Sequence, residues 1–188
     1  MSRRYKFHDK DAVYFVTFSV VDWVDVFTRN DYRRIVADSM KYCVENKELS
    51  IHAWVIMSNH VHMLISLKHQ SNNTLSGIMR DMKKFTAMHL IKAISENSRE
   101  SRREWLLSKF GKAGTKNTNN VNYQFWQQNN HPIQIADERQ YRQVLAYKYA
   151  NPVRAGWVKN EADYPWSSAG DGDMVPVELL ELGFVNVP

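Results

Sequence analysis

The sequence has few of the features that mark secreted or membrane proteins. It contains one cysteine, Cys43, so no internal disulfide can form, and the helical pattern around this residue favours a buried structural thiol. No apolar run approaches the roughly 20 residues needed to cross a bilayer. The basic N-terminus lacks the apolar stretch of a signal peptide. These absences favour a protein of the reducing cytoplasm that does not enter a membrane.

The composition is that of an ordinary globular protein. Of 188 residues, 44% are hydrophobic and 24% are charged, which argues against extensive disorder. No internal repeat is visible. We expect one domain over residues 1–170, with a basic and loop-forming insert at about 96–122, followed by a C-terminal tail at 171–188.

Positive charge is concentrated in one segment. The whole chain has a net charge of +5, whereas residues 79–116 contain ten basic and four acidic residues, a net charge of +6. Such a segment suits a polyphosphate partner or an anionic surface. A solvated helical face explains the same pattern, so charge alone does not decide between the two.

Apolar periodicity predicts an alternation of strands and helices. The order of these elements has too few helical crossovers for a parallel sheet and predicts an α+β fold, with an antiparallel sheet packed on helices. A tight turn at Ser58 and Asn59 joins two of the strands into a hairpin. The expected strands lie at 12–21, 49–57 and 60–67, with an extended segment at 123–135; the expected helices lie at 30–47, 74–94, 99–110 and 137–150, with a loop at 111–122.

The helix at 74–94 shows an apolar stripe of Leu75, Ile78, Met79, Met82 and Phe85. The helix at 137–150 is expected to begin at an Asp cap and to end before Asn151, because a residue that precedes proline is biased away from the helical region.

The stretch SNHVHMLISL contains two histidines one residue apart in a strand. Alternation places Val61, Met63, Ile65 and Leu67 on the face that meets the helices, and His60 and His62 on the other face. Their Cβ atoms are then about 6–7 Å apart, so that two ring nitrogens can converge on one metal ion. Two histidines are too few for a closed zinc site, and a third ligand has to come from elsewhere.

The last helix contains several tyrosines on different faces. At about 100° per residue, Tyr141, Leu145 and Tyr149 share one face, whereas Tyr147 and Asn151 share another. One set can pack into the core and leave Tyr147 and the amide of Asn151 to point elsewhere. An ordinary half-buried aromatic remains the alternative for Tyr147.

Two motifs in combination resemble a known family. AWVIMSNHVHMLI and the later YRQVLAYKYANPVRAGWV are similar to the single-tyrosine HUH transposases, in particular the REP-associated tyrosine transposases. The resemblance runs from about Tyr5 to Ser168 and implies the ferredoxin-like sandwich of HUH endonucleases. The insert from Arg99 to Asn122 is longer than in compact relatives, and the tail beyond Ser168 matches no pattern of the family.

The resemblance implies a chemistry and the residues that perform it. Tyr147 aligns with the nucleophile, with Tyr149 as its neighbouring rival, and His60, His62 and Asn151 align with the ligands of a divalent metal, Mg²⁺ or Mn²⁺. The segment FWQQNNH resembles one near the family's active site and makes Trp126 and His131 candidate contributors. The family nicks and rejoins DNA through a 5′-phosphotyrosine intermediate.

The expected partner is single-stranded or hairpin DNA, and the family includes both monomers and homodimers. Bases could stack on Trp23 or Trp126, and buried positions of these two tryptophans fit the sequence equally well. The phosphates are expected to follow the basic segment, at Arg80, Lys83, Lys84, Arg102 and Arg103. A DNA transposase of this kind would be associated with the nucleoid.

Two other functions remain open at this point. A metallohydrolase of a small substrate would use His60 and His62 with an activated water, but no further carboxylate or histidine stands at ligand spacing. A domesticated DNA-binding protein would mark or repress a locus without cutting it. Every position that aligns with a catalytic residue is filled, which argues against loss of the chemistry.

Overall fold

The centre of the fold is a four-stranded antiparallel sheet. The computed structural model describes residues 7–116, 122–128, 132–170 and 174–178. Within them the strand order is β2-β3-β1-β4, and every neighbouring pair is antiparallel. The strands are β1 (Tyr14–Ser19), β2 (Leu49–Ile56), β3 (His60–Leu67) and β4 (Ile133–Gln134).

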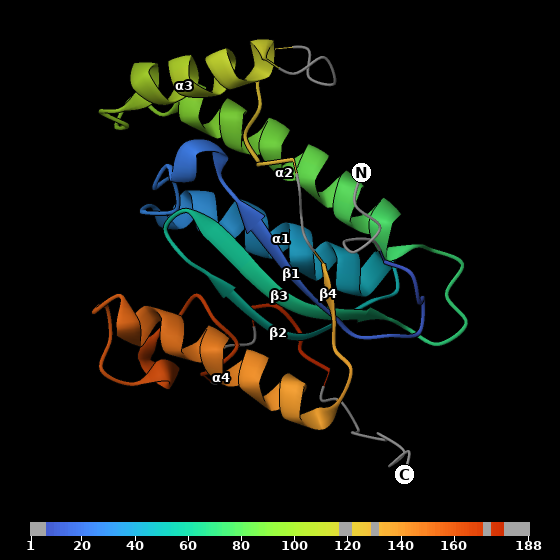
Figure 1. The fold of residues 1–188 in the computed structure, drawn as a ribbon. Helices are drawn as coiled ribbons and strands as arrows, with labels where there is room; N and C mark the ends of the chain where they lie inside the picture. Colours follow the sequence, from blue (N-terminus) through green and yellow to red (C-terminus); the bar gives the residue numbers. More distant parts are fainter. Residues whose placement is uncertain (1–6, 117–121, 129–131, 171–173, 179–188) are drawn as a thin grey trace.

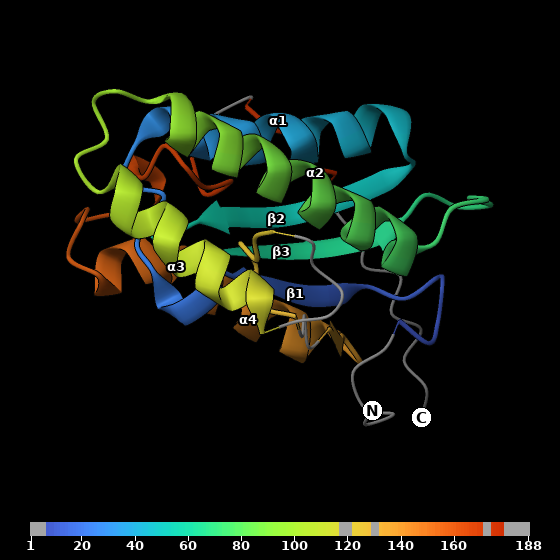
Figure 2. The ribbon, with the colours of Figure 1, turned by 90° about the horizontal axis from the view of Figure 1, so that it is seen from above.

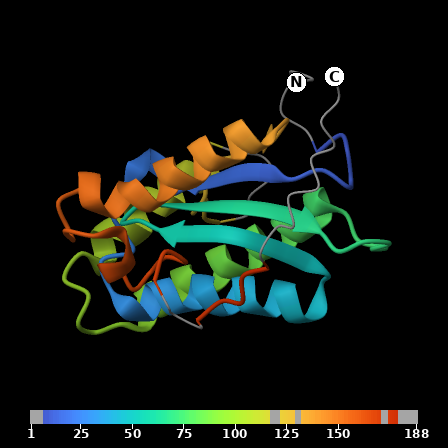
Figure 3. The same cartoon turned by 90° about the horizontal axis from the view of Figure 1, so that it is seen from below.

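Helices cover both faces of this sheet. Helices α1 and α2 lie over one face, and α4 lies along the opposite face (Figures 1 and 3). Helix α3 follows α2 and lies beside it at the edge of the layer (Figure 2). The helices are α1 (Asn30–Asn46), α2 (Leu75–Glu96), α3 (Arg103–Thr115) and α4 (Glu138–Arg154), with short 3₁₀ turns η2 (Val21–Trp23) and η3 (Glu161–Asp163). The predicted α+β class is therefore confirmed.

Two apolar clusters, one on each face, hold the layers together. Val61, Met63 and Ile65 are fully buried and belong to the large core under α1 and α2. Leu64, on the opposite face of β3, belongs to a smaller cluster in which Phe15 and Ala53 of the sheet meet Tyr141, Leu145 and Tyr149 of α4. The alternation predicted for β3 is confirmed, so the two histidines face α4.

The predicted hairpin is also present. Leu49 to Ile56 pairs with Val61 to Leu67, and the backbone N–H of Met57 donates to the carbonyl of His60 to close the turn. The register shifts between Ile51 and Ala53, which is the mark of a bulge. No helix among the described residues is both long and apolar enough to span a bilayer.

Three predicted features differ from the structure. Phe85 is 46% exposed and stacks on His89 instead of joining the apolar stripe of α2. Helix α3 continues through Gly111, where a loop was expected, and ends at Thr115. A Cβ atom at Gly114 would lie 2.8 Å from the carbonyl oxygen of Asn122, so this glycine permits close packing of the helix and does not end it.

Helix α4 passes through Pro152 and ends at Arg154, four residues beyond the predicted end. The Asp cap is confirmed, because the side chain of Asp137 accepts a hydrogen bond from the backbone N–H of Gln140. The predicted helix end was wrong because the packing of this last turn, in which Pro152 is buried, outweighs the local bias against helix before proline.

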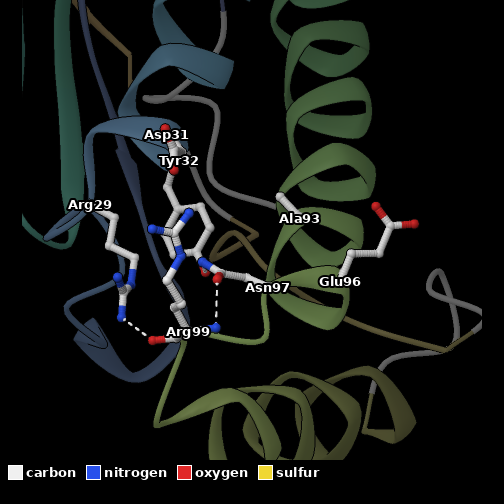
Figure 4. Close-up of a pocket in the computed structure, with 7 residues that line it drawn as sticks. All are labelled: Arg29, Asp31, Tyr32, Ala93, Glu96, Asn97 and Arg99. Carbon is white, nitrogen blue, oxygen red and sulfur yellow. Dashed lines mark hydrogen bonds between the residues drawn. The ribbon is translucent and has the colours of Figure 1, made fainter.

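A buried carboxylate fixes the corner between α2 and α3. The side chain of Glu100 is 1% exposed and accepts hydrogen bonds from Nε of Arg29 at 2.7 Å and from the backbone N–H of Arg102 at 3.1 Å. Arg29 also donates to the carbonyl of Arg99 across a hollow beside α1, in which Asn97 holds the corner backbone (Figure 4). These contacts tie the start of α1 to the start of α3.

Replacing Glu100 by alanine is expected to lower the free energy of unfolding by about 2–4 kcal/mol. The change leaves two guanidinium groups without their shared buried partner. Urea denaturation measures the difference. Glu96→Ala is the matched control, because Glu96 pairs with Lys92 in solvent and should cost less than about 1 kcal/mol. A loss no larger than that of the control would contradict a structural role for Glu100.

Candidate active site on the α4 face of the sheet

His60 and His62 lie next to each other on the face of β3 that α4 covers. Their ring centroids are 4.6 Å apart, at an interplanar angle of 66°. His62 is 7% exposed, and His60, at the start of the strand, is half-buried. The strand therefore presents two imidazoles side by side at one end of the sheet.

Asn59 determines which nitrogen of His60 carries the proton. The side-chain NH₂ of Asn59 donates to the carbonyl of Trp23 at 3.2 Å and to the carboxylate of Asp25 at 3.0 Å, which leaves its Oδ1 facing Nδ1 of His60 at 2.7 Å. Because Oδ1 can only accept, Nδ1 must donate. The lone pair of His60 is then on Nε2, where a metal ion or a proton can bind.

His62 has a similar partner on the neighbouring strand. Its Nδ1 lies 2.8 Å from the hydroxyl of Thr17, the residue directly opposite it on β1. The Thr17 hydroxyl can accept from Nδ1, which again leaves Nε2 with the lone pair. Hydrogen bonds of this kind fix the ring orientation of histidines that bind metals.

Both imidazoles are neutral at physiological pH. Burial lowers the pKa of His60 to about 4, against the opposing effect of Asp25. Burial, together with the nearby His60 and Lys148, holds the pKa of His62 well below its ordinary value. A neutral imidazole is the form that binds a metal ion.

Tyr147 of α4 reaches the histidines. Its ring centroid is 6.2 Å from that of His62, and its side chain is 48% exposed. The guanidinium of Arg154 lies 5.2 Å from the centroid of the same ring. An accessible hydroxyl group, a neutral imidazole and a fixed positive charge therefore meet at one place.

The rival tyrosine has a different environment. Tyr149 packs in the cluster under α4, and its hydroxyl lies 3.1 Å from the hydroxyl of Ser168. Tyr141 and Leu145 pack in the same cluster, as the helical-face argument predicted. Tyr149 holds α4 to the rest of the chain, whereas Tyr147 points out of that contact.

Asn151 lies one turn beyond Tyr147, with its amide group oriented by the helix. Its NH₂ donates to the carbonyls of Tyr147 at 2.9 Å and Lys148 at 3.3 Å. Pro152 has no N–H to donate to the Lys148 carbonyl, and the side chain of Asn151 supplies that hydrogen bond. Its Oδ1 takes no part in these two hydrogen bonds.

These donors fit a divalent metal ion of the Mg²⁺ or Mn²⁺ type. Two neutral imidazole nitrogens and one amide oxygen form a mixed N/O set that leaves coordination positions open. Within the described ranges no three His, Cys, Asp or Glu side chains lie together in a metal-binding cluster. The third ligand of the predicted set is an amide, which is outside that group of residue types.

Lys148 lies inside the contact between α4 and the sheet. It is 0% exposed, and its Nζ is 4.8 Å from the centroid of the Phe15 ring. Among the described residues no hydrogen-bond partner of this amine is present. Burial lowers the pKa of Lys148 well below its ordinary value. The amine adjoins the nucleophile candidate in sequence and lies close enough to His62 to contribute to the lowered pKa of that imidazole.

Two sequence predictions do not lead to this site. Trp126 is 4% exposed, donates from Nε1 to the hydroxyl of Thr86 and packs on Phe18 and Phe27 in the large core. This burial removes it as a surface on which a base could stack, and its packing gives no support for a role beside the histidines. His131 lies outside the described residues.

The five predicted DNA contacts have different environments. Arg102 is held by Glu100 and by the carbonyl of Asp25, and Lys83 donates to the carbonyl of Gln127, so both hold loops in place. Three others retain exposed or half-exposed charge and stay predicted phosphate contacts: Arg80, which pairs with its neighbour Asp81, and Lys84 and Arg103.

Sequence reasoning missed three residues of the site: Thr17, Asn59 and Arg154. Thr17 could have been found from the register, because β1 pairs with β3, but the sequence does not give that register. Asn59 has the composition of a turn residue, which conceals its second role. Arg154 stands beyond the expected end of its helix.

The fold is similar to that of a solved transposase. A solved REP-associated tyrosine transposase bound to a REP hairpin matches the chain with a TM-score of 0.63 and 21% identity, over 90% of this chain and 83% of that one. A REP-associated tyrosine transposase of Escherichia coli (strain K12) is 24% identical over 169 residues, which are 89% of this chain and 82% of that protein.

The transposase IS200-like family matches residues 11–129, which is more than half of the chain, and the chain belongs to this family. The predicted resemblance is thereby confirmed. The matched segment contains His60 and His62 but ends before α4. The assignment of Tyr147 and Asn151 therefore depends on geometry and on the motif in α4.

The environment of Lys83 predicts a rise of stability with pH. Burial lowers the pKa of this amine from 10.5 to about 8 in the folded chain. Between these values the unfolded chain binds the extra proton at this amine, so the contribution of Lys83 to the free energy of unfolding increases as pH rises through this window. The increase should amount to a few kcal/mol at most.

Lys83→Met should reduce the increase by the contribution of this one amine and leave that of Lys148, whose pKa burial also lowers. Lys84→Met, at the exposed neighbouring position, should retain the full increase. Urea denaturation between about pH 8 and pH 10.5 measures both variants against the native chain. An equal pH slope in Lys83→Met and the native chain would show that the amine is not buried in solution.

Proposed function

We propose that this protein nicks and rejoins single-stranded DNA at a hairpin through a covalent phosphotyrosine intermediate. Tyr147 is the nucleophile, and His60, His62 and Asn151 hold the divalent metal. The contact between Tyr147 and His62 carries the proposal, because it joins an accessible phenol to a neutral, pre-oriented imidazole pair. The relative solved with a REP hairpin supports hairpin DNA as the substrate.

A metal bound by these residues would supply Lewis acidity toward the oxygens of the scissile phosphate. The chain itself supplies position and charge. Helix α4 holds the Tyr147 ring beside His62, so that attack on a bound phosphate needs little further ordering. Arg154, 5.2 Å from that ring, places a positive charge where the negative charge of the phosphate increases.

The reaction exchanges one phosphodiester for another. The Tyr147 oxygen forms a bond to phosphorus as the bond from phosphorus to the 3′-oxygen breaks. The phenol loses its proton, and the departing 3′-oxygen takes one up. Because the phosphotyrosine retains the energy of the broken phosphodiester, a second 3′-hydroxyl can reverse the step and join strands without ATP.

A site within one chain is consistent with the geometry. Helix α4 packs against the sheet of its own chain and bears Tyr147 on another of its faces. Tyr147 then lies beside His62 of the same chain. A homodimer is not needed to complete the site in this arrangement. Monomeric protein should therefore be active.

Tyr147→Phe is expected to reduce formation of a covalent protein–DNA adduct by at least about 10³-fold, because it removes the attacking oxygen. Tyr149→Phe is the matched control and should form adduct, with some loss of stability because its hydroxyl no longer bonds to Ser168. The assay combines each protein with labelled hairpin DNA and Mn²⁺ and resolves adducts on a denaturing gel.

Adduct that persists in Tyr147→Phe would overturn the assignment of the nucleophile. Tight binding by the native chain without adduct on any hairpin would favour a DNA-binding protein that does not cut. Turnover of a small ester that survives Tyr147→Phe would favour a metallohydrolase.

Asn59→Ala is expected to weaken Mn²⁺ binding by roughly 10- to 100-fold. The change removes the acceptor that fixes the Nδ1–H form of His60, so that Nε2 no longer carries the lone pair in a single orientation. Isothermal titration calorimetry with Mn²⁺ measures the affinity. Asn46→Ala, on the surface of α1, should leave it unchanged. Equal affinities of the two variants would contradict a role for Asn59 in metal binding.

A further inference from the structure

Helix α3 exposes an aromatic side chain beside a row of lysines. Trp105 is 49% exposed, and Nζ of Lys109 lies 5.9 Å from the centroid of its ring. Lys112 and Lys116 follow at helical spacing and are exposed. Spacings of four, three and four residues place the four side chains on one face of the helix. This face combines a flat apolar ring with positive charge.

A hollow separates this face from the 3₁₀ turn η2. Its volume is about 400 Å³, and it is lined by Asp22, Trp105, Lys109, Lys112, Lys116 and Gln124 among others. We call it the α3 groove. Sites for small organic groups have volumes of roughly 300–1,000 Å³, so the α3 groove has room for a group the size of a nucleotide.

The α3 groove is connected to the histidines through η2. Lys109 forms an ion pair with Asp22 at 3.1 Å. The next residue, Trp23, is 55% exposed and meets the ring of His60 edge-on at 5.8 Å. A continuous series of contacts therefore leads from Trp105 on α3 to His60 in the candidate active site.

The backbone at η2 is strained. Asp22 and Trp23 both have φ of 54°, in the left-handed region that residues other than glycine avoid at a cost of about 1–2 kcal/mol each. The carbonyl of Trp23 accepts a hydrogen bond from Asn59, which helps to hold this conformation. The strained turn directs Asp22 toward α3 and Trp23 toward His60.

We propose that the α3 groove and the adjoining Trp23 bind the single-stranded DNA that flanks the hairpin, with bases stacked on Trp105 and Trp23 and phosphates bound by Lys112 and Lys116. The inference builds on the proposed function and adds a second contact surface to it. Every base has a π face that stacks on an aromatic ring without regard to sequence. Among the described residues that line the groove, the one carboxylate, Asp22, is paired with Lys109.

The charge of the α3 groove favours DNA over a second copy of the chain. In a two-fold contact the same patch would meet itself, and Lys109, Lys112 and Lys116 of both copies would face one another. Like charges placed together in this way oppose association. A polyphosphate strand is the partner that this charge complements.

Fluorescence anisotropy with a 5′-fluorescein oligothymidylate of about 12 nucleotides tests the groove in the full chain. Trp105→Ala should weaken binding about tenfold, and Trp105→Phe should retain most of the affinity. The double variant Lys112→Glu, Lys116→Glu should reduce the salt dependence, by about 0.7 in the logarithmic slope for each phosphate that the variant no longer binds. Tyr42→Ala and Lys41→Glu, exposed on α1, are the matched controls.

A second comparison separates this proposal from the catalytic one. A GC-paired hairpin with a single-stranded thymidine flank should bind native protein more tightly than the same hairpin without the flank. Trp105→Ala should lose this preference and bind the flankless hairpin normally. Tyr147→Phe should keep the preference, so the absence of adduct and the absence of flank binding report on different proposals.

The proposal would be overturned if Trp105→Ala and the lysine double variant bound the oligothymidylate as tightly as the controls do. This holds even where adduct formation persists. Sedimentation equilibrium supplies the other contrary outcome. A native dimer that becomes a monomer in Trp105→Ala, with unchanged DNA affinity, would identify the patch as a contact between copies of the chain. Circular dichroism of each variant verifies that the fold is retained.

Discussion

The site depends on the packing of α4 against the face of the sheet that bears the histidines. Tyr141, Leu145 and Tyr149 meet Phe15, Ala53 and Leu64, and this apolar contact is what places Tyr147 next to His62. The face of α4 that packs on the sheet and the face that bears Tyr147 are thus about a third of a turn or more apart around the helix axis. Without the contact, the phenol and the imidazoles would belong to separate elements with no fixed relation. The buried amine of Lys148 lies in the same contact and has no hydrogen-bond partner among the described residues. Its burial makes the contact less stable than an apolar side chain at this position would.

Hydrogen bonds then convert proximity into orientation. Asn59 fixes the proton of His60 because its own NH₂ is held by Trp23 and Asp25. The side chain of Asn151 is held at its NH₂, which takes the place of the N–H that Pro152 lacks. In both cases hydrogen bonds hold the side-chain NH₂ of an asparagine and thereby fix the position of its Oδ1. In the sequence, Asn151 and Pro152 predict a helix end. In the structure, the same pair orients the side-chain amide of Asn151, a candidate ligand.

Much of the fold could be predicted from sequence because its signals are local. Alternation in β3 assigned the two faces correctly, since a period of two depends only on the strand itself. The ends of α3 and α4 were wrong because glycine and proline were judged by propensity, whereas close packing at Gly114 and burial of Pro152 decide the outcome. Thr17 and Arg154 could not be found, because a strand register and a helix continuation bring them to the site. The sequence left open whether Trp126 is exposed or buried, and the structure places it in the large core.

In the proposed site His60 and His62 hold a metal ion beside Tyr147. Pulsed electron paramagnetic resonance of the Mn²⁺-loaded chain with ¹⁵N-labelled histidine tests it directly, because it counts the imidazole nitrogens bound to the ion. Two coupled histidine nitrogens are expected in the native chain and one in His60→Ala. Bound Mn²⁺ without any imidazole coupling would contradict the proposed site.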